Sequence, residues 1–160
     1  METQQLSILL VEDEVVLAEM YRIGLERAGY LVRLATDGPS GLQEAINAPP
    51  DLLLVDIRLP GFDGFQLLQQ LRQRMDTQDV PTVVLSNFSS DEMLDRGRQL
   101  RVLAHFVKAQ TPPGRLCEWI DSWRVAHSAI ARSEVAGSAA THESLGVVMP
   151  QADEFQTDAT

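Results

Sequence analysis

Lysine, cysteine and long apolar runs are nearly absent from this sequence of 160 residues. Lys108 is the only lysine, and 13 basic residues stand against 23 acidic ones, which gives a net charge of −10. Broad nucleic-acid binding needs many basic groups to neutralise phosphates, so the composition argues against it. The single cysteine, Cys117, excludes an intrachain disulfide framework and a multi-cysteine metal site. We expect it to be a small buried residue in a reducing compartment.

No apolar run approaches the roughly 18 residues of a membrane helix. The stretch from Met1 to Gln5 lacks the basic and apolar regions of a signal peptide. We therefore expect a cytoplasmic protein without membrane insertion. With 44% hydrophobic and 22% charged residues, the chain has the composition of a globular protein, and its length allows one domain plus an extension.

The stretch from Asp51 to Gly64 organises the rest of the chain. Leu52 to Val55 is an unbroken apolar run, which is typical of a strand covered on both faces in a parallel sheet. Asp56 follows where this strand should end, and Pro60-Gly61 and Asp63-Gly64 then mark a loop. Open α/β sheets bind ligands at the carboxyl ends of their strands, so Asp56 is a candidate functional residue. The alternative is a carboxylate that only caps the turn.

Apolar runs and helical periodicities alternate along the chain. We expect strands at 6–11, 30–35, 52–55, 81–85 and 103–107. The helices are expected at 16–28, 41–48 and 65–75, from about 89, and from 111 onward. This alternation predicts an α/β fold, specifically a flavodoxin-like, doubly wound sheet of five parallel strands with helices on both faces.

Apolar spacing also predicts which side chains the helices bury. In the first helix these are Leu17, Met20, Tyr21, Leu25 and Ala28, and in the last helix Leu116, Trp119, Ile120 and Trp123. Ser89 with Glu92 three residues later matches a capping box at the start of the fourth helix. The last apolar stripe continues weakly through His127 and Ile130. We therefore expect residues 1–126 to form the domain, and 127–160 to extend the last helix and then form a disordered acidic tail.

Polar groups follow four of the five expected strands. They are Glu12 with Asp13, Asp56, Ser86 and Lys108, and a parallel sheet brings them to one edge. Three carboxylates that lie together repel one another unless a cation joins them, and Mg²⁺ prefers such oxygen ligands. Lys108 and the Ser86 hydroxyl supply a charge and a donor suited to a phosphoryl group. Asp56 is the expected nucleophile, because a carboxylate can form an acyl phosphate.

This constellation resembles the receiver domain of two-component response regulators over about residues 6–123. The resemblance rests on Val11-Glu12-Asp13-Glu14, Asp56 with Pro60-Gly61 and Asp63-Gly64, Ser86, and Lys108. It implies that Asp56 accepts phosphate from a histidine kinase or a phosphotransfer protein. It also implies that Lys108 contacts the phosphoryl group and that Ser86 moves to hydrogen-bond it. The Mg²⁺ ligands that it implies are Glu12, Asp13, Asp56 and the main-chain carbonyl of Arg58.

The sequence departs from the family pattern at four places. Asn87 stands where the family usually has Ala or Gly, and Arg101 to Ala104 replaces a Gly-Ala-Asp-like stretch. His105 takes the aromatic switch position and is, with the serine, the candidate switch residue; we expect a partly buried, neutral imidazole there. Ala109 replaces the proline that usually follows the lysine. We expect a trans Lys108–Ala109 bond, because a cis bond without proline costs about 2.5–4 kcal/mol.

The resemblance implies a stand-alone phosphoacceptor that switches contacts with a downstream protein, with homodimerisation left open. It would be no enzyme beyond self-catalysed phosphotransfer and autodephosphorylation. We expect no direct DNA binding, since the acidic tail is too short for a second domain. One alternative is a degenerate receiver that binds partners without phosphorylation, and Asn87, His105 and Ala109 keep it open. The other is a Mg²⁺-dependent phosphatase of the haloacid-dehalogenase type, which would need a second aspartate where Arg58 stands.

Overall fold

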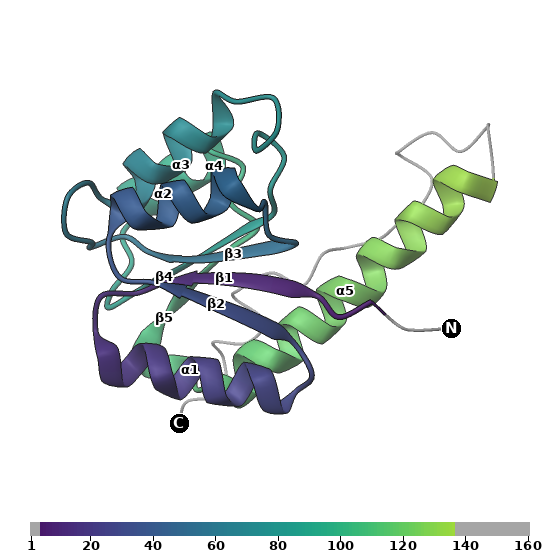
Figure 1. The fold of residues 1–160 in the computed structure, drawn as a ribbon, viewed down its shortest axis with the longest axis horizontal. Coiled ribbons are helices and arrows are strands. Elements are labelled where there is room, and N and C mark those ends of the chain that lie inside the picture. Colours follow the sequence, from purple (N-terminus) through teal and green to yellow (C-terminus); the bar gives the residue numbers. More distant parts are fainter. Residues whose placement is uncertain (1–3, 137–160) are drawn as a thin grey trace.

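A five-stranded parallel sheet lies at the centre of the protein, with helices on both faces (Figure 1). The structure is a computed structural model that describes residues 4–136. The strands are β1 (Ser7–Val11), β2 (Leu31–Ala35), β3 (Leu52–Asp56), β4 (Thr82–Ser86) and β5 (Ala104–Val107). The helices are α1 (Val15–Arg27), α2 (Gly38–Asn47), α3 (Gly64–Arg72), α4 (Asp91–Gln99) and α5 (Pro113–Ala136), with a 3₁₀ turn η1 (Lys108–Gln110) before α5.

The strand order is β2-β1-β3-β4-β5, which confirms the predicted flavodoxin-like topology. All neighbouring strands pair in parallel, and Leu54 of the central strand β3 lies between Leu10 of β1 and Val83 of β4. Helices α1 and α5 cover one face, and α2, α3 and α4 cover the other (Figure 1). The carboxyl ends of the strands therefore meet at one edge of the sheet, as expected.

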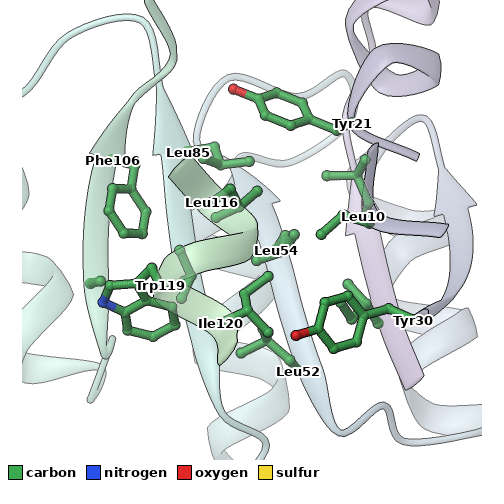
Figure 2. Close-up of a cluster of buried hydrophobic side chains, with 14 of the residues drawn as sticks. Leu10, Tyr21, Tyr30, Leu52, Leu54, Leu85, Phe106, Leu116, Trp119 and Ile120 are labelled. Atoms are coloured by element: carbon green, nitrogen blue, oxygen red, sulfur yellow. The ribbon is translucent and has the colours of Figure 1, made fainter. Parts of the chain in front are cut away.

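Each face of the sheet has its own apolar core, because successive residues of a strand point to opposite faces. Leu10 and Leu54 pack with α1 and α5, whereas Leu9 and Val55 pack with α2 and α3. The first cluster is shown in Figure 2. The apolar side chains predicted for the last helix are all buried there, namely Leu116, Trp119, Ile120 and Trp123.

Several element boundaries differ from the predictions, and local side-chain bonds explain two of them. Helix α2 begins three residues early, because the Asp37 side chain accepts a hydrogen bond from the Ser40 N–H at 2.7 Å and so caps the helix. Ser90, not Ser89, caps α4, with its hydroxyl accepting from the Met93 N–H at 3.2 Å. Helix α3 ends at residue 72 rather than 75. Strands β1, β2, β4 and β5 begin one residue late.

Three predicted burials were wrong. Helix α1 buries Ala18, Tyr21 and Leu25 but leaves Met20 42% exposed, because its inward face is rotated from the expected stripe. Ala28, which lies just after the helix, is exposed as well. Cys117 is only half-buried; its Sγ lies 3.7 Å from the Gly24 carbonyl oxygen, between α5 and α1.

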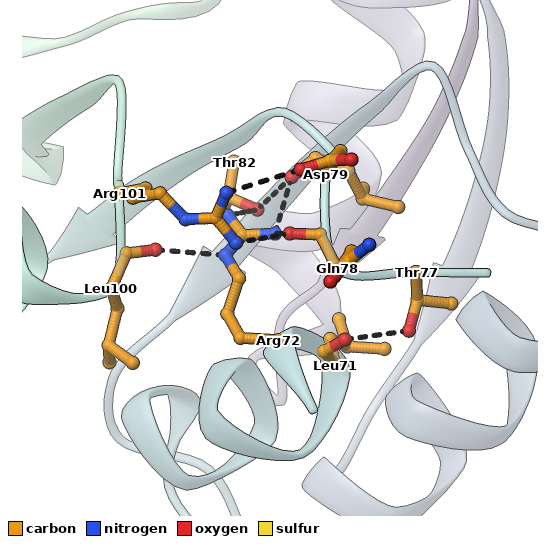
Figure 3. Close-up of polar contacts among 9 residues, drawn as sticks. Leu71, Arg72, Thr77, Gln78, Asp79, Thr82, Leu100 and Arg101 are labelled. Atoms are coloured by element: carbon orange, nitrogen blue, oxygen red, sulfur yellow. Dashed lines mark hydrogen bonds and ion pairs between the residues drawn. The ribbon is translucent and has the colours of Figure 1, made fainter. Parts of the chain in front are cut away.

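Arg72 ties the end of α3 to two other segments (Figure 3). Its guanidinium donates to the carbonyls of Leu100, Gln78 and Val80 at 2.9, 3.0 and 2.8 Å. Arg101 reaches the same loop, and its backbone has φ 59°, a left-handed conformation that glycine usually takes at the end of a helix. The family-atypical stretch from residue 101 therefore ends α4 in an ordered turn.

Helix α5 continues to Ala136, so the backbone beyond residue 126 is helical as expected. The side chain of Ile130 and the expected tail from residue 137 lie outside the described residues. Within residues 4–136, no helix is both long and apolar enough to cross a membrane.

Candidate functional site

The lysine and two of the predicted acidic residues meet at the carboxyl edge of the sheet. The Lys108 Nζ lies 2.7 Å from Asp56 Oδ2 and 2.7 Å from Glu12 Oε2. The three side chains are only 6%, 6% and 0% exposed, respectively. Asp56 is the last residue of β3, while Glu12 and Lys108 directly follow β1 and β5. Parallel pairing of these strands with their neighbours thus brings together residues that lie far apart in the sequence.

Carboxylates suited to a divalent cation surround this contact. Oxygen atoms of Glu12, Asp13 and Asp56 all lie within 4.8 Å of one another. The buried Glu12 Oε2 lies 2.7 Å from the Lys108 ammonium, which is the same ammonium that contacts Asp56. Asp13 is exposed to solvent and gives a cation access from outside. Three hard oxygen donors that share one ammonium fit Mg²⁺, so the predicted acidic ligand set is compatible with this metal.

Arg58 donates its main-chain N–H to Asp56 Oδ1 at 3.1 Å, which places it beside the acidic cluster. The predicted use of its carbonyl as a metal ligand stays a prediction.

Burial and pairing shift the pKa values at the site. Burial raises the pKa of Glu12; the bond to Lys108 opposes this effect and the charge of Asp56 adds to it. Burial alone would lower the pKa of Lys108, but its bonds to Asp56 and Glu12 outweigh that effect and raise it. Lys108 therefore remains an ammonium ion at neutral pH and offsets part of the negative charge.

Ser86 ends β4 and bonds away from the acidic cluster. Its hydroxyl donates to the Phe88 carbonyl at 2.5 Å and lies 2.6 Å from His105 Nε2. Because the only hydroxyl proton is used toward Phe88, His105 must donate through Nε2. Among the described contacts, no hydrogen bond joins Ser86 to Asp56 or Lys108. Its predicted contact with a phosphoryl group stays a prediction.

His105 is 7% exposed, and burial lowers its pKa. His105 is therefore more buried than predicted, and the direction of its pKa shift favours the neutral imidazole; its role as a switch stays a prediction. The sequence did not indicate Phe88, whose ring centroid lies 5.0 Å from the Arg58 guanidinium. This contact joins the loops that follow Asp56 and Ser86. Asn87 is exposed beside it.

The Lys108–Ala109 bond is trans, as predicted; the described chain contains no cis peptide bond. The loop after Lys108 forms the turn η1, and Thr111 donates its N–H to the Lys108 carbonyl at 3.1 Å. The Tyr21 hydroxyl donates to the Thr111 carbonyl at 2.7 Å. The helical spacing of Tyr21 predicted only a core residue, because it carries no information about the partner of the hydroxyl group.

The sheet order, the buried lysine and the acidic cluster define a doubly wound α/β protein with a site for an anion beside a cation. Residues 8–121 match the response regulator receiver domain family. The chain therefore belongs to the receiver domains of two-component response regulators.

Similar proteins agree with this assignment. The alkaline phosphatase synthesis transcriptional regulatory protein PhoP of Bacillus subtilis is 37% identical over 107 residues, which are 66% of this chain and 43% of PhoP. The DNA-binding dual master transcriptional regulator RpaA of Synechocystis sp. is 39% identical over 79 residues, covering 49% of this chain and 33% of RpaA. A putative response regulator from Chloroflexus aurantiacus has a TM-score of 0.68 at 30% identity, with 73% of this chain and 95% of that chain covered. Vibrio cholerae chemotaxis protein CheY4 has a TM-score of 0.69 at 25% identity, with coverages of 74% and 98%.

The chain spans about a third to less than a half of the curated relatives that it matches. Receiver domains interact with histidine kinases and bind Mg²⁺ at an acidic pocket, which here corresponds to Glu12, Asp13 and Asp56. The expectation of no direct DNA binding gains no support, because RpaA is named as a DNA-binding regulator.

Proposed function

We propose that this chain is a cytoplasmic response regulator whose Asp56 accepts a phosphoryl group in a Mg²⁺-dependent reaction. The donor is a histidine kinase or a phosphotransfer protein. The observation that carries the proposal is the position of the Lys108 ammonium, 2.7 Å from both Asp56 and Glu12, with Asp13 in the same cluster. Together these residues provide a nucleophile, a fixed positive charge and oxygen ligands for a cation.

In the transfer step, a carboxylate oxygen of Asp56 forms a bond to phosphorus while the bond from phosphorus to the donor's histidine nitrogen breaks. The Arg58 N–H orients the Asp56 carboxylate through its hydrogen bond to Oδ1. Lys108 places its charge where the phosphoryl oxygens arrive. Glu12, Asp13 and Asp56 would hold Mg²⁺, which supplies further neutralisation of the phosphoryl charge when bound.

Ser86 links this step to the output. To bond the phosphoryl group, its hydroxyl must leave the Phe88 carbonyl and His105 Nε2. His105 on β5 then loses a buried partner, which favours a local rearrangement. The resulting change in surface switches contact with a downstream protein or a second copy of this chain.

The phosphodonor docks on α1, which begins two residues after Asp13. Four large apolar side chains of this helix are exposed, and grouped exposed apolar residues mark interaction surfaces. We define this docking face as Val15, Val16, Met20 and Ile23, which are 68%, 85%, 42% and 42% exposed.

The two alternatives make different predictions. A degenerate receiver is favoured by the hydrogen bonds that keep Ser86 on Phe88 and His105, and it would form no phosphate adduct. A phosphatase would need an acid two residues after Asp56, but Arg58 stands there with its guanidinium over the Phe88 ring.

The experiment is intact mass spectrometry after incubation with Mg²⁺ and acetyl phosphate. The wild type should gain one phosphoryl group, and Asp56→Asn should gain none. Asp76→Asn is the matched control, because Asp76 is an exposed carboxylate paired with Arg74, and it should retain the full yield. An undiminished yield in Asp56→Asn would overturn the assignment, and a wild type without adduct would favour the degenerate receiver.

A further inference from the structure

The loop that carries Lys108 has no proline to fix its path. Ala109 leaves its own φ angle free, whereas a proline ring would restrict it. Nevertheless, the Lys108 ammonium lies within 2.7 Å of two buried carboxylates. Other contacts must therefore hold the backbone between β5 and α5.

Thr111 closes this loop around Lys108. Its N–H donates to the Lys108 carbonyl at 3.1 Å, and its hydroxyl donates to the Val107 carbonyl at 2.8 Å. Thr111 is only 3% exposed. The two bonds bracket Lys108 on both sides of its backbone, so a shift of Thr111 also shifts the lysine.

Tyr21 of α1 in turn holds Thr111. The fully buried Tyr21 side chain donates its hydroxyl to the Thr111 carbonyl at 2.7 Å, across 90 residues of sequence. One turn later, a Cβ on Gly24 would lie 2.5 Å from Pro113 Cβ, so α1 also touches the start of α5. Helix α1 therefore contacts Thr111 in the loop and Pro113 at the start of α5.

The Tyr21 hydroxyl also lies within electrostatic reach of the site. Burial raises the pKa of Tyr21 to about 12, with Lys108 lowering it and Glu12 raising it. The hydroxyl therefore stays protonated at neutral pH and remains a hydrogen-bond donor to the loop.

We infer that Tyr21 is a positioning residue for Lys108, whose hydroxyl acts through Thr111 to hold the ammonium at the phosphorylation site. The inference rests on the proposed phosphoacceptor function and adds a residue that contacts neither the phosphoryl group nor the cation. The inference predicts different effects on the two ligands of the site, the phosphoryl group and the cation. Lys108 meets the phosphoryl group, whereas the backbone of the cation ligands belongs to β3 and to the segment after β1, not to the loop.

The test compares binding of beryllofluoride, a phosphoryl analogue, with binding of Mg²⁺ alone. Tyr21→Phe removes one oxygen and leaves the Thr111 carbonyl without its donor. We expect beryllofluoride affinity and the acetyl phosphate reaction rate to fall about 5- to 30-fold, as loss of one buried hydrogen bond implies. Mg²⁺ affinity should not fall, because a displaced ammonium can only weaken the repulsion between Lys108 and the cation. Thr111→Val, which removes the bond to Val107, should act in the same direction.

Tyr30→Phe is the matched control. Tyr30 lies at the other end of the same buried cluster, away from Tyr21, and its hydroxyl bonds to Asp121 (Figure 2). This variant loses the same atom, so it should lose stability but keep wild-type beryllofluoride affinity.

A second control places Tyr21→Phe in a Lys108→Ala background, where it should have no further effect on the reaction rate. Beryllofluoride affinity in Tyr21→Phe equal to that in Tyr30→Phe would overturn the inference, as would an undiminished effect in the Lys108→Ala background. A wild type that forms no adduct would overturn the proposed function and this inference together. A normal wild type with an unaffected Tyr21→Phe overturns the inference alone.

Discussion

Replacing Lys108 with Met removes the ammonium and keeps most of the side-chain volume. Glu12 and Asp56 would then face each other in buried positions without a cation. Removing one partner of a buried ion pair costs about 3–5 kcal/mol. This loss of stability has an upper limit, because the variant can instead protonate one carboxylate. Neutralising a carboxylate of ordinary pKa near 4.3 at pH 7 costs about 3.7 kcal/mol. We therefore expect the variant to lose about 3–4 kcal/mol of unfolding free energy at pH 7 without divalent cations.

The pH dependence of this loss follows from Glu12. Burial already raises its pKa, and the variant also lacks the Lys108 bond that lowers it. The native variant thus binds a proton more readily than the unfolded chain, and its stability rises as the pH falls from 7. At pH 5 neutralising the carboxylate costs only about 1 kcal/mol. The difference in unfolding free energy between wild type and variant should therefore shrink to about that size.

Urea unfolding at pH 7 and pH 5 in EDTA measures both effects. Arg98→Met is the control, because Arg98 is 72% exposed and pairs with Asp95 on the surface, where an ion pair contributes about 0–1 kcal/mol. Saturating Mg²⁺ should recover more stability in Lys108→Met than in the wild type, since the cation replaces the missing charge. A deficit below about 1 kcal/mol at pH 7, or an equal deficit at both pH values, would refute the reasoning.

Three further predictions concern other parts of the molecule. Burial lowers the pKa of His105, so its stabilising contribution is present above about pH 6.5 and is lost as the pH falls through the native pKa. His105→Gln should therefore flatten the dependence of unfolding free energy on pH between 7 and 5, measured by urea titration. An unchanged pH dependence would contradict this. A Cβ on Gly64 would lie 2.3 Å from the Asp56 carbonyl oxygen, so Gly64→Ala should cost at least about 1–3 kcal/mol and slow phosphorylation. Gly114→Ala, with open space around it, should be neutral or stabilising, and equal stability losses in the two variants would argue against the close approach. Val16→Glu should slow transfer from a cognate kinase but not from acetyl phosphate, and equal losses with both donors would refute docking on α1.

The topology could be predicted from the sequence because its signals are repeated and local. An unbroken run such as Leu52 to Val55 is compatible with a strand buried on both faces, and five alternations leave few arrangements. The ends of the helices were harder to predict, since they depend on which side chain accepts a hydrogen bond from a free backbone N–H. Ser89 and Ser90 are the same residue type, but only the Ser90 side chain accepts a hydrogen bond from the Met93 N–H. Likewise, the Asp37 cap makes α2 begin three residues before its predicted start.

The acidic residues and the lysine of the site were predictable because parallel strands present their ends at one edge. The supporting contacts were not. Tyr21 meets Thr111 only because α1 and α5 pack on the same face, and His105 meets Ser86 only through the register of β4 and β5. Helical spacing also misplaced Met20, which depends on the rotation of α1 relative to the sheet. Such contacts are set by tertiary packing and have no signature in a single stretch of sequence.

Charge at the edge of the sheet explains why these groups form a site and not only a structural ion pair. Glu12, Asp13 and Asp56 carry −3 when ionised, and Lys108 contributes +1, so the sum is −3 + 1 = −2. A single ammonium, shared between Glu12 and Asp56, therefore cannot neutralise the cluster. One divalent cation would neutralise it, and in the proposed reaction the phosphoryl group would then meet both that cation and the lysine. Since Lys108 is the only lysine in the chain, no neighbouring lysine could take its place.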